Sequence, residues 1–308
     1  MIFYGVGNAH LQMIKALYPK LRIVARDNVL RVIGDEQQLD TFEQQVNKMR
    51  EHVLKYNHIT EEDILDIIKG NPTKNDAVKD VVVYNISGKP IKSRNANQQR
   101  LVDLFEEKDM VFAVGPAGTG KTYLSIALAV KYLKEKRARK IILSRPAVEA
   151  GEKLGFLPGD MKDKIDPYLQ PLYDALEDMM PTVKLQDMME KHIIQIAPLA
   201  FMRGRTLSDA VVILDEAQNT TPAQLRMCLT RMGWNTKMIV TGDTSQIDLP
   251  KTQRSGLIEA LSILNKVEGI GIVHLTQKDI VRHRLVTRIV NAYEAYDKEH
   301  EEKSSIEN

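Results

Sequence analysis

From about residue 97 onward, short apolar runs alternate with stretches whose apolar residues have helical spacing. The apolar runs cover residues 110–114, 140–143, 193–196, 211–214, 238–240 and 271–275. Alternation of this kind predicts strands that are joined by helices, and therefore a parallel sheet with helices on both of its faces. We expect an α/β domain over residues 97–296.

The first 85 residues have a different pattern. Residues 21–34 form two runs of alternating apolar residues around Asp27 and Asn28, which are turn residues, so this segment predicts a β-hairpin. Helical spacing follows over residues 35–55, Thr60 stands as an N-cap before a second helix, and residues 81–84 are expected to form a strand. These elements predict a small α+β domain over residues 1–85, a linker over 86–96 and, after the α/β domain, a polar tail over 297–308.

The composition of the chain excludes several classes of protein. Its 308 residues, 43% of them hydrophobic, are enough for about two domains. Lys and Arg total 43 and Asp and Glu total 41, and residues 1–90 contain 12 cationic and 12 acidic residues, so net charge predicts no nucleic-acid site. Cys228 is the only cysteine and cannot form an intramolecular disulfide, which favours a reducing compartment. The sequence shows neither a membrane-spanning run nor a signal peptide, so we expect a soluble, cytoplasmic protein.

The strongest chemical signal is the sequence GPAGTGKT at residues 115–122, directly after a predicted strand. This is the Walker A pattern, in which glycines let backbone N–H groups point at phosphate oxygens at the start of a helix. Lys121 is expected to reach the β and γ phosphates, and Thr122 to offer its hydroxyl to Mg²⁺. ATP and Mg²⁺ are the expected cofactors, and the residues predicted to bind nucleotide here are Gly115, Pro116, Ala117, Gly118, Thr119, Gly120, Lys121 and Thr122.

Two later strand ends carry the residues needed for hydrolysis. The run at 211–214 ends in Asp215 and Glu216, and we expect Asp215 to hold Mg²⁺ as a Walker B carboxylate and Glu216 to polarise the attacking water. The run at 238–240 is followed by TGDTSQ, where Gln246 can hydrogen-bond both the γ-phosphate and the water. Thr-Gly-Asp is also ordinary turn sequence, so this third site depends on the first two. A kinase would share the phosphate loop, but the glutamate beside Asp215 favours activation of water.

The residues around these motifs resemble two related groups of proteins. DEAQ at 215–218 together with TGDTSQ at 241–246 resembles the cores of superfamily-1 helicases, and Gln98 lies where such ATPases read adenine with a glutamine. The closer resemblance is to the PhoH-like family and spans about residues 95–295; the segments that carry it are 115–122, 144–159, 164–168, 201–206, 215–219 and 241–250. The resemblance implies a RecA-like P-loop NTPase fold, ATP hydrolysis and, for residues 1–85, a KH-like domain.

The resemblance also implies partners. A chain with room for one such core needs oligomerisation to act as a helicase, so a homo-oligomer is implied, with a hexameric ring as the expectation. Arg254, Arg282 and Arg288 are candidates for an arginine finger that acts in cis or from a neighbouring subunit, and a surface salt bridge is the alternative role for each. Single-stranded RNA and an endoribonuclease are the implied partners, and a membrane is not.

Arginines near strand ends are candidates for contact with nucleic acid. Arg145 lies where helicase-like cores carry a strand-contacting loop, whereas Arg203 and Arg205 can equally hold the phosphate-side loops together. Residues 34–37, GDEQ, depart from the GxxG clamp of RNA-binding KH domains. Two functions stay open at this point: an ATPase linked to RNA, or a nucleotide-dependent switch that controls a protein partner without translocation. Turnover that is stimulated by nucleic acid distinguishes them.

Overall fold

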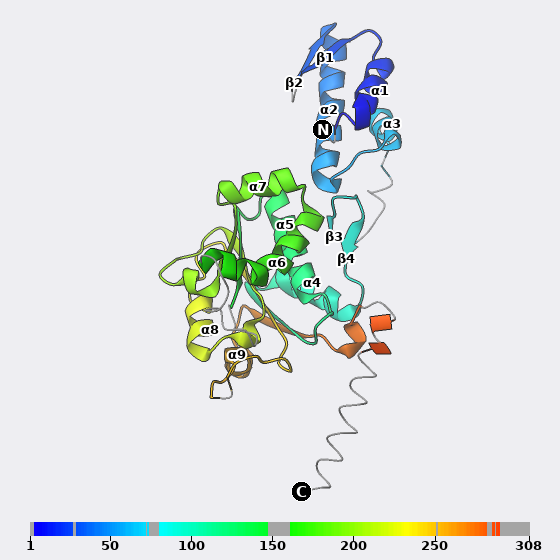
Figure 1. The fold of residues 1–308 in the computed structure, drawn as a ribbon. Coiled ribbons are helices and arrows are strands. Elements are labelled where there is room, and N and C mark those ends of the chain that lie inside the picture. Colours follow the sequence, from blue (N-terminus) through cyan, green and yellow to red (C-terminus); the bar gives the residue numbers. More distant parts are fainter. Residues whose placement is uncertain are drawn as a thin grey trace.

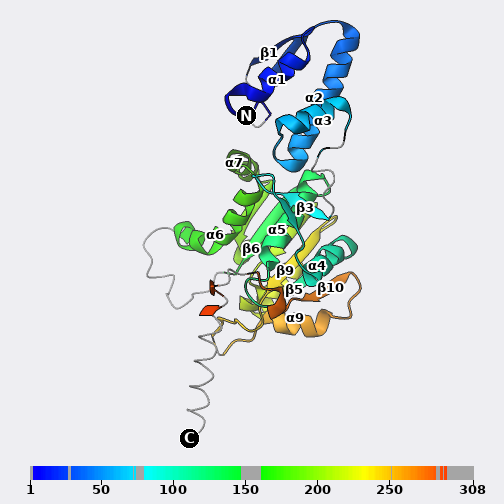
Figure 2. The same ribbon diagram turned by 90° about the vertical axis from the view of Figure 1, so that its right-hand side faces the viewer.

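The computed structural model describes residues 3–26, 29–71, 73, 80–146, 161–250, 252–281, 285–286 and 288–289. The chain forms two units, a smaller one at the top of Figure 1 and a larger one below it. The view in Figure 2, turned by 90°, shows the same separation, with the sheet of the larger unit between its helices. In the described part of the chain, every helix is too short or too polar to cross a membrane.

The smaller unit is a two-stranded antiparallel sheet packed against helices. Its elements are α1 (Ala9–Leu17), β1 (Arg22–Arg26), β2 (Val29–Ile33), α2 (Glu36–Tyr56) and α3 (Glu61–Lys69). Ile14, Met49 and Ile64 are fully or almost fully buried in its core. The paired strands of the predicted hairpin and both predicted helices are confirmed, whereas the predicted turn at Asp27 and Asn28 lies outside the described residues. Thr60 is the N-cap that the sequence predicts, and it forms a capping box with Asp63. Its likeness to a KH domain stays a prediction.

The larger unit contains a six-stranded sheet in which every neighbouring pair is parallel. Its strands are β5 (Met110–Val114), β6 (Lys140–Arg145), β7 (Ile194–Pro198), β8 (Ala210–Leu214), β9 (Lys237–Gly242) and β10 (Ile270–His274). Their order in the sheet is β10-β5-β9-β8-β6-β7. All six apolar runs predicted as strands are confirmed, with β5, β6, β8 and β9 in the interior of the sheet and β10 and β7 at its edges.

Helices cover both faces of this sheet, as predicted. Val111 and Ala113 of β5 belong to the core that contains α4 (Ala96–Glu107), α5 (Lys121–Lys134), α6 (Met161–Met179) and α7 (Thr182–Glu190). Phe112 of the same strand belongs to the opposite core, formed with α8 (Pro222–Leu229) and α9 (Gly256–Leu264). Cys228 of α8 is fully buried in that second core. Successive strand residues therefore face opposite layers, which explains why the strands are apolar throughout.

A second hairpin joins β3 (Val81–Tyr84), which confirms the strand predicted over 81–84, to β4 (Pro90–Lys92), which lies where the sequence suggests a linker. Its residues Val82, Val83 and Ile91 are buried in the core that also holds α4 and α5. The predicted boundary between residues 85 and 86 falls inside this hairpin, and the linker-like residues of 86–89 form its turn. The hairpin packs with the larger unit because its three apolar side chains would otherwise be exposed to water.

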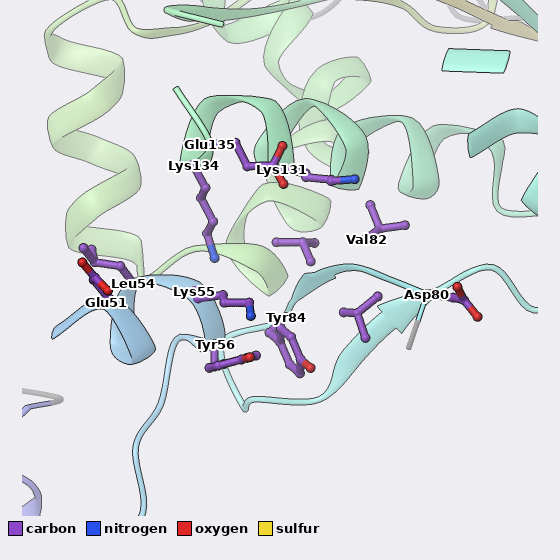
Figure 3. Close-up of a pocket in the computed structure, with 12 residues that line it drawn as sticks. Glu51, Leu54, Lys55, Tyr56, Asp80, Val82, Tyr84, Lys131, Lys134 and Glu135 are labelled. Carbon is purple, nitrogen blue, oxygen red and sulfur yellow. The ribbon is translucent and has the colours of Figure 1, made fainter. Parts of the chain in front are cut away.

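Asn57, the residue that ends α2, joins the two units. Its Nδ2 donates to the carbonyl oxygens of Tyr84 at 2.7 Å and Met179 at 3.2 Å, and its Oδ1 accepts from Lys134 Nζ at 2.9 Å. Beside it lies a cavity of about 550 Å³, into which Lys134 points from the end of α5 in Figure 3. Burial lowers the pKa of Lys134 to about 8. The end of α2 is thus anchored to the larger unit through polar contacts.

Candidate nucleotide site

Three strand ends meet at the carboxyl edge of the parallel sheet. The order of strands places β9 between β5 and β8, so the loops that follow these three strands are neighbours. The phosphate loop follows β5, Asp215 and Glu216 follow β8, and Asp243 follows β9. Ligands of open α/β sheets bind at this edge, outside the carboxyl ends of the strands. The three motifs, which are separate in the sequence, therefore form one site in the fold.

The phosphate loop needs glycine at its two ends. A Cβ added to Gly115 would lie 2.3 Å from the carbonyl oxygen of Leu275, which belongs to the segment after β10. Gly120 has a φ of 79° and caps the N-terminus of α5, a left-handed conformation that other residues adopt only with strain. These constraints turn the loop so that it opens into the first turn of α5, whose free N–H groups form an anion site.

Lys121 is held inside the loop. Its Nζ donates to the carbonyl oxygens of Gly115 at 2.6 Å and Pro116 at 2.8 Å. Burial lowers the pKa of Lys121, and the nearby carboxylates of Asp243, Glu216 and Asp215 oppose this shift. The ammonium is therefore already positioned within the loop where the sequence places the phosphates.

Thr122 and Asp215 form the part of the site that fits Mg²⁺. The Thr122 hydroxyl donates to Asp215 Oδ1 at 2.6 Å, and the hydroxyl of Thr241, at the end of β9, donates to the same oxygen. Asp215 is buried, and a hydroxyl oxygen and a carboxylate side by side are the hard oxygen ligands that Mg²⁺ takes beside phosphate and water. These two side chains fit the ion. Thr241, the first residue of the TGDTSQ motif, supports the carboxylate through a contact that the sequence did not predict.

Glu216 has a backbone conformation that is rare for its residue type. Its φ is 53°, in the left-handed region, which costs about 1 kcal/mol or more for a residue other than glycine. Its carboxylate contacts Arg145 Nη2 at 3.3 Å and accepts from Gln218 Nε2 at 2.6 Å. Two neighbours of different type therefore fix the direction of this carboxylate. Arg145 also lies 4.0 Å from Asp215 Oδ2, so it balances the charge of both acids.

Gln218 links the ends of β8 and β9. Besides its bond to Glu216, its Nε2 donates to the carbonyl oxygen of Gln246 at 3.2 Å, and its Oε1 accepts from the Asp243 N–H at 3.0 Å. Asp243 in turn accepts from the N–H of Ala117 in the phosphate loop. The side chain of Gln246 is exposed on this loop. One buried amide thus connects the Walker B glutamate to the loop that carries the third motif.

Gln98 lies on α4 behind the phosphate loop. Its side chain is nearly buried, with Nε2 donating to Thr119 O at 2.9 Å and Oε1 accepting from the Arg94 N–H at 2.8 Å. A cavity of about 700 Å³ opens here and is lined by Gln98, Gly118, Gly120 and Tyr123. Among the described residues, each end of the amide makes one of the two hydrogen bonds that it can form, since an amide has two donors and two acceptor sites.

The remaining arginines are dispersed. Arg254, before α9, and Arg288 are exposed, whereas Arg282 lies outside the described residues. Arg203 is exposed, and Arg205 donates to Gln195 Oε1 at 2.6 Å, which ties it to β7. Arg145 is engaged with the Walker B carboxylates instead of being free at the surface. The roles of these side chains in binding nucleic acid or in completing a neighbouring site stay predictions.

A parallel sheet whose phosphate-loop strand and Walker B strand flank a third, polar-ended strand defines a RecA-like P-loop NTPase. The family model described as PhoH-like protein matches residues 90–294, and the chain belongs to this family. It is 48% identical over 280 residues to a PhoH-like protein of Bacillus subtilis (strain 168), covering 89% of this chain and 88% of the relative. A PhoH-like protein of Synechocystis sp. (strain ATCC 27184 / PCC 6803 / Kazusa) is 45% identical over 295 residues, 94% and 90% of the two chains. Among solved structures, the Pif1 helicase from Candida albicans aligns with a TM-score of 0.34 at 14% identity over 64% of this chain and 42% of that one, a likeness too low to bear on function.

Proposed function

We propose that the chain binds ATP with Mg²⁺ and hydrolyses it at the carboxyl edge of the parallel sheet. The observation that carries this proposal is that one edge gathers a phosphate-loop lysine, a hydroxyl–carboxylate pair that fits Mg²⁺, and an oriented glutamate. Lys121 and the first turn of α5 bind the β and γ phosphates. When bound, Mg²⁺ neutralises phosphate charge, and Thr122 and Asp215 are the residues that hold it.

Glu216 is the proposed residue that orients the water for in-line attack on the γ-phosphate. Its carboxylate accepts a hydrogen bond from the water and receives its proton as the bond to phosphorus forms, while ADP leaves on the opposite side. Contacts with Gln218 and Arg145 fix the orientation of the Glu216 carboxylate. Gln246 reports the state of the γ-phosphate, because its backbone is bonded to the same Gln218 amide that contacts Glu216. Arg254 and Arg282 are the proposed arginine fingers.

Gln98 is the proposed reader of adenine. Its free donor and acceptor positions match the N7 acceptor and N6 donor of adenine, and guanine presents acceptors at both places. Gln98→Ala is expected to reduce the preference for ATP over GTP by about 5- to 100-fold, the value of one bidentate contact. Binding of fluorescent ATP and GTP analogues measures this ratio. Gln99→Ala, which removes the neighbouring bond to Asp103, is the control and leaves the ratio unchanged; an equal loss of both nucleotides in Gln98→Ala would contradict the assignment.

We further propose that RNA is the partner that the ATPase acts on or responds to. The family membership and the position of a small α+β unit before the ATPase unit support this. With a single core, strand separation requires several subunits, and a homo-hexameric ring in which a neighbour's arginine completes each site is the proposed assembly. An endoribonuclease is the proposed protein partner. The second candidate function, a nucleotide switch without translocation, is favoured by the Gln218 contacts, which connect the γ-phosphate side to a surface loop.

Stimulation by RNA distinguishes the two functions. Phosphate release is measured at saturating ATP and Mg²⁺, with and without single-stranded RNA of mixed sequence. If RNA is the partner, turnover rises with RNA concentration to a plateau, because binding favours the state in which the site is complete. Turnover that is the same at every RNA concentration would contradict the RNA link and favour the switch. Duplex RNA of the same sequence serves as the control for nonspecific effects of a polyanion.

A further inference from the structure

The outer face of the β1–β2 hairpin combines cationic and apolar side chains. The strands pair so that each arginine lies opposite an aliphatic residue, and all six side chains on this face are exposed. The inner face is different, because Ile23, Ala25, Leu30 and Val32 pack against the core of the smaller unit. The six residues of the outer face, called the hairpin face below, are Arg22 with Ile33, Val24 with Arg31, and Arg26 with Val29.

The arginines of this face have no acidic partner among the described residues. None of them forms an ion pair with a carboxylate in the described part of the chain. Asp27 is the single acidic residue in the sequence between residues 22 and 33. Residues 1–90 are neutral in sum, with 12 cationic and 12 acidic residues, so the balancing acids lie outside this segment. A positive field of this kind attracts a polyanion although net charge does not reveal it.

The apolar residues of the hairpin face are also unusual. Ile33 is 66% exposed, Val29 57% and Val24 39%. The solvent face of a two-stranded antiparallel sheet is normally polar, so aliphatic side chains that alternate with arginines give this face both the charged and the apolar groups that a ligand of mixed character needs. In Figures 1 and 2, β1 lies at the end of the smaller unit that is farther from the parallel sheet, where the ATPase unit does not cover it.

We propose that the hairpin face binds single-stranded RNA. Guanidinium groups bind phosphate with two parallel hydrogen bonds and stack on bases, and valine and isoleucine contact the apolar faces of unstacked bases. A duplex offers phosphates alone at such a surface, because its bases are stacked inside, so a single strand uses both kinds of side chain. This proposal rests on the RNA partner proposed above and assigns the contact to the sheet face, not to residues 34–37.

An anionic membrane surface is the alternative occupant, and the composition of the face disfavours it. Segments that lie in the membrane interface bury Trp, Phe or Leu side chains. The hairpin face has none of these three residue types and carries only two valines and one isoleucine between its arginines. The charge and the small apolar area therefore fit an extended nucleic-acid strand better than a lipid layer.

The test replaces Arg22, Arg26 and Arg31 together by Gln in the full chain. Binding is measured by fluorescence anisotropy with labelled single-stranded RNA at several salt concentrations. The expected result is affinity at least about tenfold weaker and a slope of log Kd against log salt that is lower by about 2, the value for three lost phosphate contacts on a single strand. The matched control, Lys48→Gln, Arg50→Gln and Lys69→Gln, removes three exposed cations from α2 and α3 and keeps the wild-type affinity.

Two further variants separate chemistry from charge and from folding. Arg→Lys at the same three positions keeps the salt slope but loses part of the affinity, because lysine cannot stack on bases. Val24→Thr with Val29→Thr weakens binding without changing the slope. Equal RNA affinity in the triple Gln variant and the wild type would overturn the proposal. A triple Gln variant that no longer binds phosphatidylserine vesicles, which the wild type binds, but that still binds RNA would overturn it too. If the wild type itself binds no RNA at low salt, the proposal that RNA is the partner is refuted, whereas the proposal of ATP hydrolysis is not affected.

Discussion

Glu216→Gln is expected to lower ATP turnover by about 10²- to 10⁴-fold, the range for loss of a general base. The substitution keeps the shape of the side chain and an oxygen that can accept from Gln218 Nε2, which is 2.6 Å from the carboxylate in the wild type. A neutral amide cannot accept the proton of the attacking water. The ATP dissociation constant should change little, because Lys121 and the phosphate loop remain intact. Phosphate release and binding of a fluorescent ATP analogue measure the two quantities.

Glu259→Gln is the matched control for this variant. Glu259 is a carboxylate on α9 that lies 3.8 Å from Arg226 and away from the strand ends. Its replacement should leave turnover at the wild-type level. Turnover of Glu216→Gln within a factor of about 3 of the wild type would show that Glu216 does not act in the hydrolytic step, because an amide cannot replace a carboxylate as a base.

Lys121→Ala is expected to weaken ATP binding by about 10²- to 10³-fold, the loss that follows removal of one partner from a buried charged contact. Two effects add in this variant. The phosphates lose their cation, and the loop loses the bonds from Nζ to the carbonyl oxygens of Gly115 and Pro116. Isothermal titration with ATP and Mg²⁺ measures the affinity, and the thermal unfolding midpoint without nucleotide shows how much of the effect comes from the loop itself.

The control for this variant lies on the same helix. Lys131→Ala removes a lysine three turns further along α5, where the side chain pairs with Glu106 at 3.2 Å. It is expected to bind ATP as the wild type does. Equal affinity of Lys121→Ala and the wild type would show that the loop binds no triphosphate. This outcome would also remove the basis for assigning Gln98 to adenine.

The strands and the phosphate loop could be predicted from the sequence because local pattern determines them. Each strand of the parallel sheet is a short apolar run between polar segments, and the periodicity that marks it does not depend on distant residues. The loop is similar, since the conformations of Gly115 and Gly120 are imposed by close contacts and by a left-handed φ that glycine tolerates. For these elements the structure confirms both position and type.

The contacts between motifs could not be predicted, because they depend on the order of strands in space. Arg145 and Glu216 are far apart in the sequence, and the two meet only because β6 lies beside β8. The contacts of Gln218 with Asp243 and of Thr241 with Asp215 could not be predicted for the same reason, since each joins the ends of the neighbouring strands β8 and β9. The sequence predicts β3 as a strand, but the segment that contains β4 is interpreted as a linker because its turn residues are locally indistinguishable from one. The burial of Ile91 in the core that holds α5 is a tertiary effect.

Steady-state release of phosphate by the wild-type chain tests the central claim most directly. The purified chain is assayed with ATP and Mg²⁺, and excess EDTA is then added. The predicted result is continuous turnover that stops on chelation, because Thr122 and Asp215, which lie 2.6 Å apart, are proposed to hold Mg²⁺ at the phosphates. Absence of turnover with and without RNA, or turnover that continues unchanged in EDTA, would contradict hydrolysis of ATP at this site.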